Sequence, residues 1–182
     1  MEYVKEVPTG IDIHIQKLQR FLYAELKKAW GINDNVAYDS YGRAYRNQTV
    51  DGFIPEVYIG NKEYREVFFN DKRKAISFFG VGESIRYNKG TATASVYLVL
   101  MVNLAQIKGG VTRADEEAHI DLEKLLQPGR SGFEMVSFET GIDNVLKEYS
   151  GWKKDQGMKY RDLQPFHCFR INLSLTYNIQ DC

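Results

Sequence analysis

The chain has 182 residues, which is enough for one domain with its own hydrophobic core. Its 24 Lys and Arg residues balance 24 Asp and Glu residues, which argues against a protein whose overall charge attracts nucleic acid or an anionic membrane. The 12 Tyr and 10 Phe residues are in excess, and such aromatic content suits a β-rich core or a protein interface.

The two cysteines and the first ten residues indicate the cellular compartment in which the protein folds. Cys168 and Cys182 do not form a disulfide framework, so we expect folding in the reducing cytoplasm. Residues 1–10 (MEYVKEVPTG) contain no apolar run, so we expect no signal peptide and read them as an extended arm.

Residues 11–30 predict an amphipathic helix. Its apolar stripe recurs at helical spacing and comprises Ile11, Ile15, Leu18, Leu22 and Leu26. The outer face carries Lys17, Arg20, Lys27 and Lys28. Thr9 or Asp12 is placed to cap the start of this helix, and Gly31 to end it.

Residues 32–52 predict a long loop rich in tyrosine and arginine. A loop of this length in a compact domain is usually functional or mobile. Its candidate contact residues are Tyr38, Tyr41, Arg43, Tyr45 and Arg46. This mixture suits a protein contact or stacking on nucleic acid, while a solvated loop with some tyrosines folded back is the plainer alternative.

Three short strands follow, at residues 53–59, 63–69 and 74–79. Short turns between them favour a β-meander, and Pro55 favours a sheet edge for the first strand. The third strand is expected to end at Gly80-Val81-Gly82.

Residues 91–107 (TATASVYLVLMVNLAQI) predict the central strand. The segment carries no charge, and from residue 96 onward apolar side chains occupy both of its alternating faces. A strand that is apolar on both faces must be covered on both, so it belongs in the middle of a sheet.

The last third of the chain predicts two helices and two strands. A helix begins near Thr112, which we expect to form a capping box with Asp115, and residues 115–117 place three carboxylates in its first turn. A strand at residues 133–138, a short helix and a loop at residues 150–165 with an exposed Trp152 follow. Residues 166–179 alternate strictly between apolar and polar side chains, as in an antiparallel strand. Strands and helices in separate runs indicate an α+β fold over residues 1–182.

No complete catalytic, metal or cofactor motif occurs in the sequence. The segment 80–84 (GVGES) lacks the Lys-Ser/Thr ending of a phosphate loop. Glu116 and His119 have the spacing of a di-iron helix, but no second such pair occurs, and a surface histidine is expected. We therefore predict no enzymatic activity, no metal and no cofactor.

The element order resembles that of the tail-terminator and tail-completion proteins of tailed bacteriophages. The segments that carry the resemblance are the helix IDIHIQKLQRFLYAEL, the hairpin VYIGNKEYREVFF, the strand ASVYLVLMVNLAQI, the helix ADEEAHIDLEKLLQ and the strand FRINLSLTYNI. The resemblance implies a structural virion protein made in the host cytoplasm. It would form a homo-oligomeric ring at the head–tail junction, beside portal, adaptor or tail proteins, with DNA only as the genome passing through.

Ring assembly predicts contacts between subunits, with no membrane involved. The candidate interface combines the residues of the 32–52 loop with Trp152, Lys17, Arg20, Asp115 and Glu116. Two other classes of function remain as alternatives. A small enzyme or ligand-binding domain would hold a pocket between sheet and helices, and a nucleic-acid-binding module would use the Tyr/Arg loop.

Overall fold

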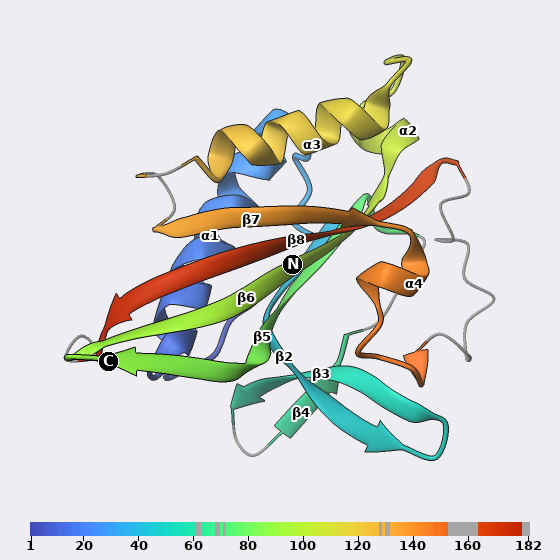
Figure 1. Cartoon of the computed structure of the whole chain (residues 1–182). Coiled ribbons are helices and arrows are strands. Elements are labelled where there is room, and N and C mark those ends of the chain that lie inside the picture. The colour runs from blue at the N-terminus through green and yellow to red at the C-terminus, as the bar shows by residue number, and fades with distance from the viewer. Residues whose placement is uncertain are drawn as a thin grey trace.

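The computed structural model describes residues 1–60, 63–67, 70, 72–127, 129, 132–152 and 164–179. This part of the chain forms an α+β fold with eight strands and four helices, which confirms the predicted class (Figure 1). The elements are β1 (Glu2–Tyr3), α1 (Ile11–Ala29), β2 (Tyr38–Thr49), β3 (Gly52–Gly60), β4 (Glu63–Glu66), β5 (Ala75–Asn88), β6 (Thr91–Asn103), α2 (Leu104–Ile107), α3 (Ala114–Leu125), β7 (Phe133–Thr140), α4 (Ile142–Val145) and β8 (Phe166–Asn178).

All strands join one mixed sheet in the order β4-β3-β2-β5-β6-β8-β7, and β1 pairs with β2. The β1–β2 and β2–β5 pairs are parallel, whereas the other pairs are antiparallel. β6 lies between β5 and β8 and pairs with β8 from Thr91↔Asn178 to Asn103↔Phe166. β6 therefore lies inside the sheet, as predicted for the central strand, and β8 is antiparallel to it, as its alternating pattern indicated.

One face of the sheet packs against α1 and α3. The even-numbered side chains of β6 from Ala92 to Val102 lie in this core, together with the apolar stripe predicted for the first helix. α3 adds Ala118 and Leu122, which are fully buried. Figure 1 shows α1 passing behind β6 and β8. Each aliphatic side chain removed from water in this way contributes about 1.5–3 kcal/mol.

The other face of the sheet has its own core, built by the chain around α4. Val145, Leu146, Tyr149 and Trp152 are buried against the odd-numbered side chains of β6 and against β5 and β8. Phe78 of β5 meets Trp152 edge to face, with 5.8 Å between the ring centroids. This second layer covers β6 from Tyr97 to Met101.

The prediction of a loop at residues 32–52 is wrong, because residues 38–49 form β2. β2 changes partners along its length, from β5 to β3, and its register shifts between Ser40 and Arg43. The alternation of apolar and polar side chains breaks at this shift, which hid the strand from its sequence pattern.

The predicted meander of residues 53–79 is only partly correct. β3 and β4 form the expected hairpin, but β5 pairs with β2 and β6 instead of β4. β5 also continues through Gly80-Val81-Gly82 to Asn88. A Cβ on Gly80 would lie 2.0 Å from Cζ of Tyr97, so the glycine gives that ring its place on the sheet. β3 is not at the edge, because β4 lies outside it.

The predicted caps at the starts of the two helices are wrong. No side chain caps the start of α1 or of α3, where Gly10 and Arg113 hold the capping positions. Gly31 follows α1 in the left-handed region at φ 57°, as the predicted helix end requires. Arg113 bonds Asp115 and Glu116, so these carboxylates pair with the guanidinium instead of with Thr112.

The predicted loop at residues 150–165 lies mostly outside the described residues, which resume at residue 164. Trp152, the aromatic residue singled out in this loop, belongs to the described residues. Trp152 is 1% exposed, so the prediction that it is exposed is wrong.

Candidate functional site

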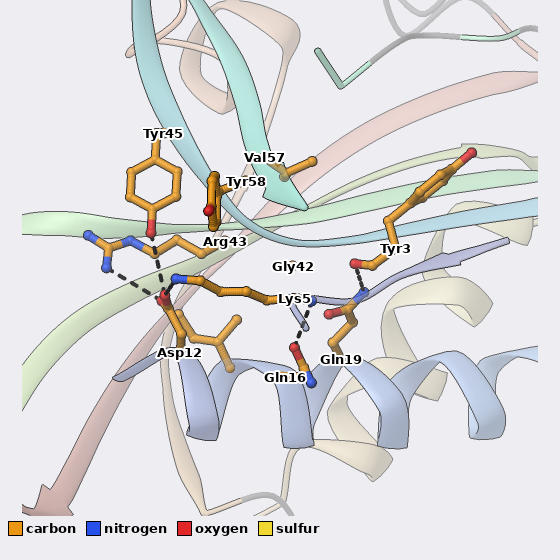
Figure 2. A pocket seen from close by; sticks show the side chains of 11 residues that line it. Tyr3, Lys5, Asp12, Gln16, Gln19, Gly42, Arg43, Tyr45, Val57 and Tyr58 are labelled. Carbon is orange, nitrogen blue, oxygen red and sulfur yellow. Dashed lines mark hydrogen bonds and ion pairs between the residues drawn. The ribbon is translucent and has the colours of Figure 1, made fainter. Parts of the chain in front are cut away.

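A small hollow lies between α1, the N-terminal arm and strands β2 and β3 (Figure 2). Its volume is about 20 Å³, which is room for about one water molecule. The lining residues are Tyr3, Lys5, Asp12, Ile15, Gln16, Gln19, Gly42, Arg43, Tyr45, Val57 and Tyr58.

A buried carboxylate organises the polar side of this cavity. Asp12 is 7% exposed and forms ion pairs with Lys5 at 2.7 Å and with Arg43 at 3.5 Å. The Tyr45 hydroxyl donates to the same carboxylate at 3.4 Å. Burial opposes the charged form of Lys5, but the hydrogen bond and charge of Asp12 outweigh it and raise the pKa of the ammonium group. These four side chains, here called the clamp, satisfy one another.

The clamp fastens the arm to the body of the protein. Gln16 Oε1 accepts from the backbone N–H of Lys5, and Gln19 Nε2 donates to the carbonyl oxygens of Tyr3 and Ser40. Figure 2 shows these side chains converging from α1 and the arm. Within the arm of residues 1–10, Glu2–Tyr3 form strand β1 beside β2, and α1 holds this part of the arm through Gln16 and Gln19.

A second polar cluster pins the α4 region to the sheet. Arg170 of β8 is 6% exposed, bonds both carboxylate oxygens of Glu148 at 2.8 and 2.6 Å, and lies 3.8 Å from the ring centroid of Tyr97. The Tyr97 and Tyr149 hydroxyls are 2.9 Å apart. Burial raises the pKa of both phenols. In this cluster the ion pair of Arg170 and Glu148 packs beside two phenols that burial keeps neutral, and these contacts hold the α4 region on the sheet.

Two histidines meet between α3 and β8. The Nε2 atoms of His119 and His167 are 2.9 Å apart, and the His119 ring packs on Phe138 and Phe169. Burial, and then the charge of His167, lower the pKa of His119 to about 4. His119 was predicted to be a surface histidine, but its ring is half-buried, and β8 brings it a partner from 48 residues away.

The histidine pair offers two ligands for a metal, whereas zinc sites use three or four protein ligands. Within the described residues, no group of three or more His, Cys, Asp or Glu side chains could hold a metal ion. His167 and Cys168 point to opposite faces of β8, as the alternation of a strand requires, and Cys168 is buried in the α4-side core.

The α4-side layer stops partway along the sheet. Beyond it, short polar side chains of β5, β6, β8 and β7 lie on a face that no described element covers, at the left end of the sheet in Figure 1. Two shallow hollows of about 350 and 240 Å³ lie on this face. We call it the open strip, and it comprises Ser84, Arg86, Thr93, Ser95, Glu134, Val136, Ser174 and Thr176.

Sequence comparison adds no relative to this picture. No protein-family model matches the chain, and no curated protein is significantly similar to it. Among the described residues, no helix combines the length and apolar character needed to span a bilayer.

The structure separates the residues that the sequence grouped as one candidate interface. Tyr38, Tyr41 and Trp152 are at most 3% exposed, so they pack inside the subunit and cannot meet a neighbour without rearrangement. The Tyr38 hydroxyl is 2.9 Å from Ser77 Oγ, deep in the sheet. Arg43 and Tyr45 belong to the clamp.

The remaining candidates lie at or near the surface, on three different elements. Lys17 and Arg20 are exposed on α1, Glu116 is exposed on α3, and Asp115 is partly exposed beside Arg113. Arg46 is exposed on β2, near Glu83.

The open strip was missed by the sequence reasoning, although a signal for it exists. Thr91, Thr93 and Ser95 alternate with Ala92 and Ala94, so the strand is apolar on one face here and on both faces only from residue 96 onward. The change in pattern marks the end of the second layer.

Proposed function

We propose that this chain is a structural subunit that assembles with copies of itself into a ring at the head–tail junction of a tailed bacteriophage. The observation that carries the proposal is the uncovered end of the sheet. Strands β5, β6, β8 and β7 present a face there that no described element covers, and β7 forms an eight-residue edge with exposed Met135 and Val136. An open face and an open edge are surfaces that a neighbouring subunit would cover.

The form of the polar clusters agrees with a structural role. The clamp and the Arg170 cluster join segments of the chain to one another, with each charge paired. The cavity between α1 and the sheet, at about 20 Å³, is far below the roughly 300–1,000 Å³ of small-molecule sites. This volume favours the ring over a ligand-binding domain with a pocket at that position.

Two further features support assembly. Equal numbers of acidic and basic residues avoid the self-repulsion that would oppose packing many copies side by side. The element order, from an N-terminal amphipathic helix to a long final strand, is the order on which the resemblance to phage tail-terminator and tail-completion proteins rests. In this role the neighbours are portal, adaptor or tail proteins, and the genome passes through the ring.

The test is assembly, measured by native mass spectrometry and negative-stain electron microscopy. The protein is purified alone and also after co-expression with the proteins encoded beside it, because a neighbouring component can template ring closure. We expect closed rings of identical subunits in at least one preparation. A protein that stays monomeric in both, and does not sediment with its neighbours, contradicts the proposal.

A further inference from the structure

We propose that His119 and His167 form a binding site for a divalent transition-metal ion, held between α3 and β8 by the Nε2 atoms of both rings. Copper and nickel are the ions that we expect the site to favour. The site is separate from the proposed ring and goes beyond it. The sequence predicted no metal, because Glu116 and His119 share a helix with metal-site spacing while the second histidine comes from a strand 48 residues away.

The spacing of the two nitrogens fits a single metal ion. The Nε2 atoms of His119 and His167 are 2.9 Å apart. Two nitrogens that each lie about 2.0–2.1 Å from one ion are about 2.9 Å apart at adjacent corners of a square, and about 3.3 Å apart at tetrahedral corners. Square arrangements of nitrogen and oxygen ligands are typical of Cu²⁺ and Ni²⁺, whereas zinc sites are tetrahedral and use three or four protein ligands. The pair therefore favours copper or nickel over zinc.

The protonation of the pair suits metal binding. Because burial and the charge of His167 lower the pKa of His119 to about 4, the His119 ring is neutral at pH 7 and can offer a lone pair. In the metal-free pair, the Nε2–H of one ring donates to the Nε2 of the other. A metal ion takes the place of this hydrogen. The donor ring then carries its proton on Nδ1, and both rings turn so that their lone pairs meet at the ion.

Aromatic side chains hold both rings in position. The His119 ring centroid lies 4.1 Å from that of Phe138 and 4.9 Å from that of Phe169, and the His167 centroid lies 5.3 Å from that of Phe169. Ligands that are positioned before binding lose little conformational freedom when the ion arrives. Both histidines are partly exposed, so water can complete the coordination from the solvent side.

The charges around His119 favour a cation. Asp115 and Glu116 lie one turn before it on α3, and their negative charges act on its ring. Arg113 bonds both carboxylates, which are therefore neighbours of the site and not ligands. Two carboxylates and one guanidinium leave one net negative charge beside the two imidazoles, and this charge attracts a metal ion.

An ion at this position would join α3 to β8 across the helix-side face. Only the folded chain brings the two imidazoles together, so metal binding stabilises the folded state over the unfolded one. Saturating Cu²⁺ or Ni²⁺ should therefore raise the urea concentration at which half of the protein is unfolded.

The test is isothermal titration calorimetry of the full chain, free of any affinity tag, with Cu²⁺, Ni²⁺, Zn²⁺ and Mg²⁺. We expect one Cu²⁺ ion per chain, weaker binding of Ni²⁺ and Zn²⁺, and no binding of Mg²⁺, which prefers oxygen ligands. His119→Gln and His167→Gln should each weaken Cu²⁺ binding by about tenfold or more, since even the partners of metal ligands contribute this much. His14→Gln, which removes the third histidine of the chain, is the matched control and should leave the affinity unchanged.

Electron paramagnetic resonance of the Cu²⁺-loaded wild type identifies the ligands without any variant, so the test stands even if a variant fails to fold. Two equatorial imidazole nitrogens are expected. A spectrum with only oxygen ligands overturns the inference. Absence of Cu²⁺ and Ni²⁺ binding up to about 100 µM also overturns it, and so does Cu²⁺ binding that survives both His119→Gln and His167→Gln.

Discussion

The two ends of the β5–β6–β8 surface differ in what covers them. At one end, helices α1 and α3 cover one face and the α4 region covers the other, so β6 is apolar on both faces and fully buried. At the other end, the described part of the chain covers only the helix-side face, and the opposite face is the open strip. Strands β5, β6 and β8 pass through both environments, so the difference lies in the side chains of one face alone.

The face of β8 that carries the even-numbered residues follows this change step by step. Cys168 is fully buried, Arg170 is buried with a paired charge, and Ser174 and Thr176 reach the surface. A second layer is thus required at one end of the sheet and optional at the other. A surface of small hydroxyls can remain in water or meet another copy, whereas exposed leucines would have to be covered permanently.

The largest effect is expected from truncating the doubly covered end. Leu100 and Leu173 are at most 1% exposed, and Leu→Ala at either site leaves a cavity, so the free energy of unfolding should fall by about 2–5 kcal/mol. Urea denaturation followed by circular dichroism measures this loss. Losses below about 0.5 kcal/mol at both sites would show that these strands do not form the core.

A smaller effect is expected where the second layer rests directly on the backbone. Gly80→Ala would put a Cβ 2.0 Å from the Tyr97 ring, so the ring must move away from Tyr149 and Arg170. We expect a loss of about 1–3 kcal/mol in the same unfolding assay. Gly82→Ala is the matched control, since its Cβ would lie 3.2 Å from Cβ of Ser95 at the border of the open strip, and it should cost less. Equal costs would contradict the difference between the two ends.

The histidine pair gives the helix-side face a dependence on pH. The pKa of His119 is about 4 in the folded protein, below its ordinary value near 6.5, so the unfolded chain binds the proton more tightly. Its stabilising contribution is present above pH 6.5 and is lost as the pH falls toward 4. Because the ring is partly exposed, we expect a loss of about 1–2 kcal/mol.

Urea titrations at pH 7 and pH 4.5 would measure this dependence, with His119→Gln as the comparison. Paired carboxylates such as Asp12 also respond to acid, so the informative quantity is the difference between the two proteins. The wild type should lose more stability on acidification than the variant. An identical loss would show that the histidine pair does not titrate as described.

The smallest effect on stability is expected in the open strip. Thr93 and Ser95 lie on its exposed face, so replacing either by Ala removes little packing and should change the free energy of unfolding by less than about 0.5 kcal/mol. A loss above about 1 kcal/mol in the isolated subunit would mean that part of the chain covers this face.

Strands and helices whose apolar side chains recur with one uninterrupted period could be predicted from the sequence. α1 and β8 agree with their predicted positions because their apolar side chains recur regularly and tertiary contacts reinforce the pattern. β6 agrees with its prediction from Thr91 to Asn103, but the strand predicted through residue 107 is wrong at its end, where Leu104–Ile107 form α2. β2 could not be predicted, since its register shift and its change of partner interrupt the alternation. The end of β5 was placed too early because Gly80 and Gly82 suggest a turn, whereas here the glycines admit the Tyr97 ring and a closely packed Ser95.

The functional surfaces depend on contacts between distant residues, which composition cannot supply. The tyrosine-rich segment suggested an exposed interface, but Tyr38 and Tyr41 are core residues of β2. His119 and His167 meet only because α3 packs over β8. The open strip could have been anticipated from the Thr/Ser alternation of residues 91–95, although its charged edges come from β5 and β7, whose pairing no local pattern indicates.

The most direct test of the account is the accessibility of the open strip in the assembled protein. Ser95→Cys, in a Cys182→Ser background, would be labelled with a maleimide in dilute subunits and in assembled material, with Lys28→Cys on α1 as the reference position. Native Cys168 is fully buried and should react slowly in both states. The account predicts rapid labelling of residue 95 in dilute subunits and strong protection on assembly, with residue 28 protected less. Equally rapid labelling of residue 95 in both states would contradict it.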